Sequence, residues 1–292
     1  MPHGPFDLAA TLAPLRQGVR DPTIRIGRDE AWRALRTHDG PATLHLRVEG
    51  SELVATAVGP GAAAAVDMAP LLAGLTDDPR ALHPVHRSVD EARRRVPGLR
   101  LTSGTGVSDA LLWVILAQKV VGLDARRAYR DLVARLGEPA PGAVGLVLPP
   151  DPDRLAATPS WIFHACNVER RRAAVIIAVA RRARSLDGLA ALPADEARRR
   201  MTTLPGVGAW TAAEVTAVSH GDPDAVPLGD YHLPNVVAHA LAGEARGDDA
   251  RMLELLEPYA GQRGRVIRLL MAAGPRPPQY GPRLARHDIR GL

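Results

Sequence analysis

A short glycine turn between two helical stretches constrains this chain more than any other feature. Residues 204–208 read LPGVG and follow a short helix expected at residues 195–201. Gly206 and Gly208 can adopt positive φ angles and leave room for another backbone to approach closely. The helix that starts near Ala209 has unpaired amide N–H groups in its first turn, and a phosphate binds well there. The pattern predicts a backbone grip on a phosphate, with an ordinary helix–turn–helix corner as the alternative.

One carboxylate stands where the next helix is expected to start. Asp230 lies between Gly229 and Tyr231, about two dozen residues after the glycine turn. A helix N-terminus favours the ionised form of a carboxyl group, and an ionised carboxylate stabilises positive charge that develops beside it. Asp222 and Asp224 are alternatives in the preceding loop. Asp230 could also serve as a helix N-cap, and the two roles are compatible.

Composition excludes several kinds of chemistry. The chain has 292 residues and a net charge of +5, which suits a polyanionic partner. Lys119 is the only lysine, so any mechanism that needs a lysine amine must use it. Cys166 is the only cysteine, which excludes an internal disulfide, a cysteine-based zinc site and a four-cysteine iron–sulfur cluster.

The pattern of residues divides the chain into three parts. Residues 1–85 predict a small antiparallel α+β domain, residues 86–274 a helical domain, and residues 275–292 a tail rich in proline and arginine. The expected fold class is therefore α+β, mostly helical, with a small N-terminal antiparallel sheet.

Periodicity places the individual elements. Ser88, with Glu91 three residues later, predicts a capping box at the start of the helical part. Strands are expected at residues 23–26, 42–48 and 53–58. Helices are expected at residues 62–75, 109–121, 123–136, 167–186, 195–201, 211–220, 231–241, 249–256 and 265–273.

Neither a signal peptide nor a membrane span is expected. The first residues lack a basic start followed by a long apolar run. The apolar run at residues 175–180 is too short to cross a bilayer and is flanked by arginines. We expect a cytoplasmic protein, associated with the nucleoid if it is bacterial.

These motifs together resemble the helix-hairpin-helix DNA glycosylase superfamily, over roughly residues 88–273. Residues 204–208 look like its hairpin, residues 229–231 like the segment with its catalytic aspartate, and residues 113–118 like its apolar helix that ends in a glutamine. The 3-methyladenine DNA glycosylase II branch is the most similar. It has an extra N-terminal antiparallel domain and a tryptophan where Trp210 stands.

The resemblance implies a monofunctional enzyme of base excision repair. It would act as a monomer on double-stranded DNA and hydrolyse the N-glycosidic bond of flipped-out alkylated purines, such as 3-methyladenine. Lyase-competent relatives have a lysine at the position of Trp210, so no Schiff base is expected there. No cofactor is required, and an Na⁺ or K⁺ ion would be held at the hairpin by backbone carbonyls of Thr202, Leu204 and Val207.

The resemblance also assigns roles to side chains. Asp230 would be catalytic, and Lys119 would stand where relatives fill the gap left by the flipped base. A phosphate contact or plain surface charge is the alternative for Lys119, and core packing is the alternative for Trp210. The expected substrate pocket is Trp210, Glu214, Gln118, Tyr231 and Gln262. The expected DNA-binding residues are Gly206, Gly208, Ala209, Thr211 and Lys119.

Two departures from the branch leave the substrate open. Members of the branch have two further pocket aromatics. This chain has Glu214 at the first of these positions and Gln262 near the second. A glycosylase for another damaged base, deaminated or oxidised, is therefore one alternative. A non-catalytic helix-hairpin-helix protein that only binds DNA is the other.

Overall fold

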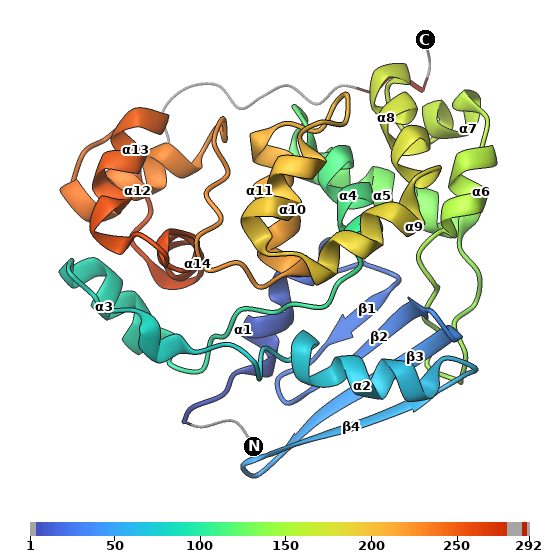
Figure 1. The fold of residues 1–292 in the computed structure, drawn as a ribbon, viewed down its shortest axis with the longest axis horizontal. Helices are drawn as coiled ribbons and strands as arrows, with labels where there is room; N and C mark the ends of the chain where they lie inside the picture. Colours follow the sequence, from blue (N-terminus) through green and yellow to red (C-terminus); the bar gives the residue numbers. More distant parts are fainter. Residues whose placement is uncertain (1–3, 279–287, 291–292) are drawn as a thin grey trace.

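The computed structural model describes residues 4–278 and 288–290. Helices form most of the molecule and stand over one small sheet (Figure 1). The expected α+β class is confirmed. Most of the expected tail at residues 275–292 lies outside the described residues.

The sheet is a four-stranded antiparallel meander in the order β1-β2-β3-β4. Its inward residues alternate with outward ones, as in Ala42, Leu44 and Leu46 of β3, which are all buried. Helices α1 and α2 pack on the sheet and complete this part of the core. The bounds are β1 Ile24–Ile26, β2 Glu30–Thr37, β3 Gly40–Glu49, β4 Glu52–Val58, α1 Leu8–Leu12 and α2 Ala62–Leu72.

Strand β2 and helix α1 were not expected from the sequence. The residues of β2 do not alternate cleanly, since Ala34 and Leu35 are adjacent and both buried. Pairing with β3 holds the strand, and the Trp32 ring stacks on His45 across the pair, with 4.2 Å between ring centroids. Tertiary pairing therefore decides the conformation of this segment.

The remaining helices form the body of the molecule. They are α3 Arg87–Arg95, α4 Val107–Ala117, α5 Gly122–Leu136, α6 Pro152–Ala157, α7 Ser160–Ala165, α8 Arg170–Ala180, α9 Ala183–Asp187, α10 Ala194–Met201, α11 Ala209–Ser219, α12 Leu233–Ala242, α13 Asp249–Leu256 and α14 Arg263–Ala273. No helix in the described part of the chain is both long enough and apolar enough to cross a membrane.

Three expectations about helices are wrong. Residues 167–186 form α8 and α9 rather than one helix, because the chain turns at Arg181 and Arg182. Ser88 lies inside α3 and caps nothing, while Glu91 accepts a hydrogen bond from Arg87 at 2.7 Å. The helix expected at residues 109–121 ends at Ala117.

The helices pack around two separate hydrophobic cores. The larger joins the sheet to α4, α5, α8 and α11, and the smaller is built from α3, α12, α13 and α14, which we call the C-terminal lobe. In Figure 1 this lobe lies to the left of α10 and α11. Residues 220–232 run from α11 to α12 and so cross between the two cores.

Candidate active site

The two glycines of the hairpin between α10 and α11 differ in geometry. Gly206 has a φ of +88°, and a Cβ added there would collide with the Val175 side chain. Gly208 has an extended backbone, with φ −96°, so it does not use the positive φ that a glycine permits. An added Cβ at Gly208 would meet no atom within 4 Å. Exposed Gly208 and Ala209 therefore leave the N-terminus of α11 open to an incoming group.

Gln118 ties the corner between α4 and α5 to this hairpin. Its Nε2 donates to the Gly206 carbonyl at 2.9 Å and to the Thr211 hydroxyl at 2.9 Å. Lys119 follows with a φ of +53° and an exposed side chain. A non-glycine residue in this conformation is uncommon and frequently marks a functional turn. The structure thus places the expected gap-filling residue beside the expected DNA grip.

Asp230 and Trp210 meet across 20 residues of sequence. The Trp210 Nε1–H donates to Asp230 Oδ2 at 2.9 Å. Asp230 Oδ1 accepts the amides of His232 at 2.7 Å and Leu233 at 2.9 Å, where α12 begins. Asp230 therefore holds the turn that leads into α12, whose N-cap residue is His232, and its carboxylate is half-buried. Trp210 contacts the main core and orients that carboxylate.

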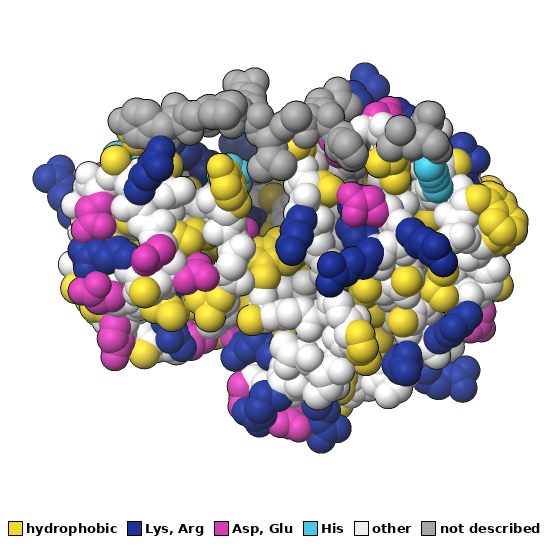
Figure 2. Space-filling view, turned by 90° about the horizontal axis from the view of Figure 1, so that it is seen from above, with side chains coloured by type: hydrophobic (Ala, Val, Ile, Leu, Met, Phe, Trp, Pro, Cys, Tyr) yellow, Lys and Arg dark blue, Asp and Glu magenta, His cyan; other side chains and the backbone are white. Residues whose placement is uncertain are grey.

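Glu214 lies one helical turn after Trp210 on α11, so the two side chains share a face of the helix. Burial, reinforced by the negative charge of Asp230, raises the pKa of Glu214 to about 7, although the positive charge of Arg268 opposes the shift. Figure 2 shows a hollow between the C-terminal lobe and the helices α10 and α11. Asp230 comes from the segment between α11 and α12, whereas Glu214 comes from α11 itself. Sequence reasoning missed Arg268, because only the packing of α14 brings it close to α11.

Three other expected site residues have different surroundings. Tyr231 is 71% exposed and packs edge-on against His232, so it lies at the rim and not inside a pocket. The Gln262 side-chain oxygen accepts a hydrogen bond from Arg265 Nε at 2.7 Å, where α14 begins. Thr211 is 2% exposed and its hydroxyl is bound by Gln118, so its side chain does not reach the surface.

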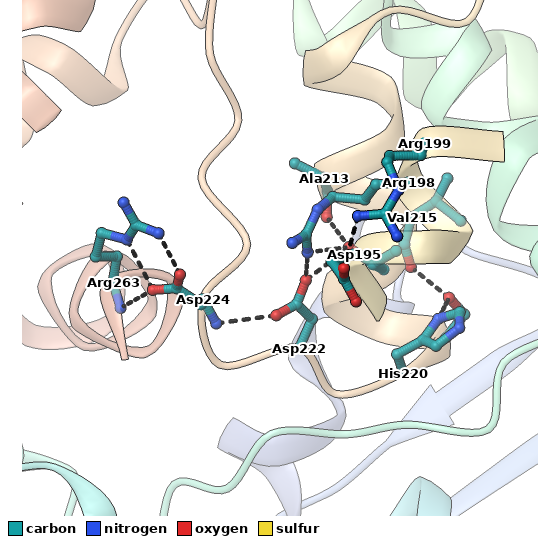
Figure 3. Close-up of polar contacts among 11 residues, drawn as sticks. Asp195, Arg198, Arg199, Ala213, Val215, His220, Asp222, Asp224 and Arg263 are labelled. Carbon is teal, nitrogen blue, oxygen red and sulfur yellow. Dashed lines mark hydrogen bonds and ion pairs between the residues drawn. The ribbon is translucent and has the colours of Figure 1, made fainter. Parts of the chain in front are cut away.

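Asp222 and Asp224 are fully engaged in ion pairs (Figure 3). Asp222 pairs with Arg198 of α10 and accepts the Thr216 hydroxyl at 3.0 Å. Asp224 pairs with Arg263 of α14, whose Nε donates at 2.8 Å, and the Asp224 amide donates to Asp222 Oδ1 at 3.0 Å. Asp230 is the one carboxylate of this segment that has no ion-pair partner among the described residues.

The ion pairs of Asp222 with Arg198 and of Asp224 with Arg263 also fix the loop that carries Asp230. Burial alone would raise the pKa of Asp224, but hydrogen bonds from Arg263 outweigh it and leave that pKa below its usual value. Asp224 thus remains an ionised partner at neutral pH, and the two ion pairs hold the start of segment 220–232 between α10 and α14. From the sequence, these two residues were considered only as alternatives to Asp230 for the catalytic carboxylate.

Positive charge is unevenly distributed on the face that contains the cleft. In Figure 2 Lys and Arg side chains predominate on the half of the face with the central helices, whereas acidic side chains are frequent on the C-terminal lobe. Some arginines are structural: Arg172 is buried and donates to the Leu116 carbonyl at 2.9 Å. Arg199 and Arg200 pair with Asp195 and Glu196 within α10.

The monovalent cation expected at the hairpin stays a prediction. The Leu204 carbonyl accepts the Val207 amide at 3.0 Å and retains a second lone pair. No group of three or more His, Cys, Asp or Glu side chains suited to a metal exists among the described residues. Cys166 is buried, and burial raises the pKa of its thiol to about 11, as for an unreactive structural cysteine.

Comparisons with known proteins begin with sequence. No family model matches the chain. A probable bifunctional transcriptional activator/DNA repair enzyme AlkA of Mycobacterium tuberculosis is 29% identical over 142 residues, which are 48% of this chain. The match spans 28% of the length of that relative.

Solved structures match over more of the chain. A 3-methyladenine DNA glycosylase from Archaeoglobus fulgidus superposes with a TM-score of 0.77 and 16% identity, covering 93% of this chain and 96% of that one. An 8-oxoguanine glycosylase/lyase from Clostridium acetobutylicum, in complex with double-stranded DNA, gives 0.61 and 13%, covering 85% and 96%. The chain therefore has the fold of the helix-hairpin-helix DNA glycosylases, which confirms the resemblance stated from its sequence.

Proposed function

We propose that this chain is a monofunctional DNA glycosylase that hydrolyses the N-glycosidic bond of flipped-out alkylated purines in double-stranded DNA. The observation that carries the proposal is the Asp230 carboxylate, held by a hydrogen bond from Trp210 in the first turn of the helix that follows the hairpin. The sequence match to an AlkA protein and the fold shared with a 3-methyladenine DNA glycosylase support the same reaction class.

The hairpin and the corner at Lys119 would hold the DNA. Amides at the N-terminus of α11 would bind one phosphate, which requires no sequence preference. Lys119 would enter the gap left by the flipped base with its aliphatic stem and reach a phosphate with its ammonium group. Flipping costs a few kcal/mol and is easiest for a damaged, poorly paired base.

Asp230 would carry the chemical step. When the bond between the sugar and the base breaks, positive charge develops on the sugar. A carboxylate beside that charge stabilises the transition state more than the ground state. Trp210 donates to one oxygen of Asp230 and two amides donate to the other, so the carboxylate is oriented before substrate arrives. The same carboxylate would receive a proton from the attacking water.

The absence of lyase activity is part of the proposal. A lyase step needs an amine that forms a Schiff base with the sugar. Trp210 cannot supply one, and the only lysine, Lys119, lies at the corner after α4. Borohydride should therefore trap no covalent complex between the protein and its abasic product.

Base release from methylated duplex DNA tests the reaction. The wild type should release 3-methyladenine or 7-methylguanine, identified by chromatography, and Asp230→Asn should release it about 10²–10³-fold more slowly. DNA binding by the variant, measured by fluorescence anisotropy, should be retained. Equal turnover by the variant would remove Asp230 from its role, and binding without any release by the wild type would favour a non-catalytic DNA-binding protein.

Other parts of the proposal follow from the same family likeness. The protein would act as a monomer in the cytoplasm, with residues 1–85 and 86–274 as its two domains and a structural Na⁺ or K⁺ at the hairpin. A glycosylase for another damaged base is the second candidate. Glu214 favours it, because a carboxyl group replaces an aromatic face in the cleft.

A further inference from the structure

Glu214 is a carboxyl group without a partner beside the Asp230 carboxylate. It is half-buried on the face of α11 that carries Trp210, and no hydrogen bond or ion pair joins it to any described residue. Its carboxyl oxygens are not among the fully buried polar atoms that lack a partner in the described residues, so a group from solvent can reach them. The neighbouring acids Asp222, Asp224 and Asp230 each have partners. Glu214 is thus free to bind a group that enters the cleft.

Two charged groups face Glu214, one from each neighbouring element. Asp230 approaches from the loop before α12, and Arg268 approaches from α14. The Arg268 Nη2 is already bound to the Ala10 carbonyl at 2.8 Å. With a pKa of about 7, a large share of Glu214 is protonated at neutral pH. The site therefore combines an acid with the Asp230 carboxylate, as hydrolysis with a poor leaving group requires.

The charge of the base decides whether that acid is needed. An alkylated purine that carries a positive charge leaves its sugar as a neutral molecule. An uncharged purine would leave as an anion, unless a ring nitrogen receives a proton as the bond breaks. An enzyme restricted to cationic bases has no use for a carboxylic acid in this position.

We propose that Glu214 is the general acid that lets this site release uncharged damaged purines in addition to cationic ones. This inference rests on the proposed glycosylase function. The Glu214 carboxylic acid gives its proton to a ring nitrogen as the C1′–N9 bond breaks, and the bonding electron pair stays with the base. Water adds to C1′ and gives a proton to Asp230. Asp230 then releases that proton to solvent, and Glu214 takes one up.

The test compares E214Q with wild type on two substrates under single-turnover conditions. One duplex carries methylated purines, and the other carries a single hypoxanthine as an uncharged probe. E214Q should release hypoxanthine about 10²-fold more slowly, since glutamine cannot transfer the proton, and should release methylated purines within about threefold of wild type. E254Q is the matched control, because Glu254 is exposed on α13 and pairs only with Arg251 among the described residues.

The pH profile of the wild type provides a measurement that does not depend on a variant. Protonated Glu214 is the active form, so hypoxanthine release should be highest below about pH 7 and fall as the pH rises further. The profile of E214Q should lack this fall. Equal losses on both substrates, or hypoxanthine release by E214Q at the wild-type rate, would overturn the inference. Release of methylated purines alone by wild type would overturn it and keep the proposed function, whereas release of neither base would overturn both.

Discussion

Gly206 and Gly208 stand two positions apart, yet they differ in conformation and surroundings. Gly206 needs its positive φ and the space beside Val175, so it maintains the turn itself. Gly208 has a backbone that any residue can adopt, with open space around it. If that space receives a phosphate, Gly208 matters for the complex and hardly at all for the free protein.

This difference makes a paired prediction. Gly206→Ala should lower the free energy of unfolding by roughly 1–3 kcal/mol, because alanine is strained at positive φ. Gly208→Ala should change it by less than about 1 kcal/mol, yet weaken duplex DNA binding roughly tenfold, equal to about 1.4 kcal/mol. Urea denaturation and fluorescence anisotropy measure the two effects. Unchanged DNA affinity in a folded Gly208→Ala protein would contradict the assignment of this turn as the phosphate grip.

Residues of the candidate site were predictable where a local motif fixes them. Asp230 and Trp210 were named from the family resemblance that the hairpin and residues 229–231 carry, and the structure joins them by a hydrogen bond. Arg268 could not be found this way, because nothing in the sequence of α14 shows that it faces α11. The polar contact of Thr211 was equally hidden, since Gln118 comes from a distant segment, whereas Gln262 is bound by Arg265 only three residues away.

At the scale of elements, helix boundaries were predicted best where the apolar residues repeat strongly. Helix α13 occupies the residues expected of it, since Asp248 caps it and its apolar positions repeat on one face. The break between α8 and α9 had no signal, because alanine, arginine and valine all favour or tolerate a helix. Strand β2 was missed because its pattern suits a strand only when β3 lies beside it.

A buried ion pair joins α14 to the segment before α3. Asp77 and Arg265 are almost fully buried, and Arg265 Nη1 donates to Asp77 Oδ2 at 2.9 Å. The Leu101 amide donates to the same oxygen, also at 2.9 Å. Removal of one partner from such a pair leaves a buried charge uncompensated.

Asp77→Ala should therefore lower the free energy of unfolding by about 3–5 kcal/mol. Its neighbour offers the control: Asp78 pairs with Arg80 at 3.0 Å, but both side chains are exposed. Asp78→Ala should keep a denaturation midpoint close to that of wild type, because water screens the exposed pair. Similar midpoints for the two variants would show that the Asp77–Arg265 pair does not anchor α14.

At the scale of the whole molecule, the candidate site lies between two separately packed cores. The hairpin, Trp210 and Glu214 come from the larger core, and Arg268 comes from the C-terminal lobe. Asp230 lies on the segment that crosses between them. Its position relative to the hairpin therefore depends in part on the pairs Arg198–Asp222 and Asp224–Arg263, which fasten the start of that crossing to α10 and α14 (Figure 3).

Loss of the Asp224–Arg263 ion pair should affect catalysis more than DNA binding. In Asp224→Asn the ion pair with Arg263 is lost, while the hairpin and its neighbours keep their contacts. Small misplacements of a catalytic group can cost large factors in rate, so we expect kcat for base release to fall about tenfold to a hundredfold, with KM and DNA affinity unchanged. Glu254→Gln removes an exposed ion pair of the same lobe and should leave kcat unchanged. A parallel loss of DNA affinity in Asp224→Asn would mean that this pair supports the DNA-binding face as a whole and does not act through Asp230.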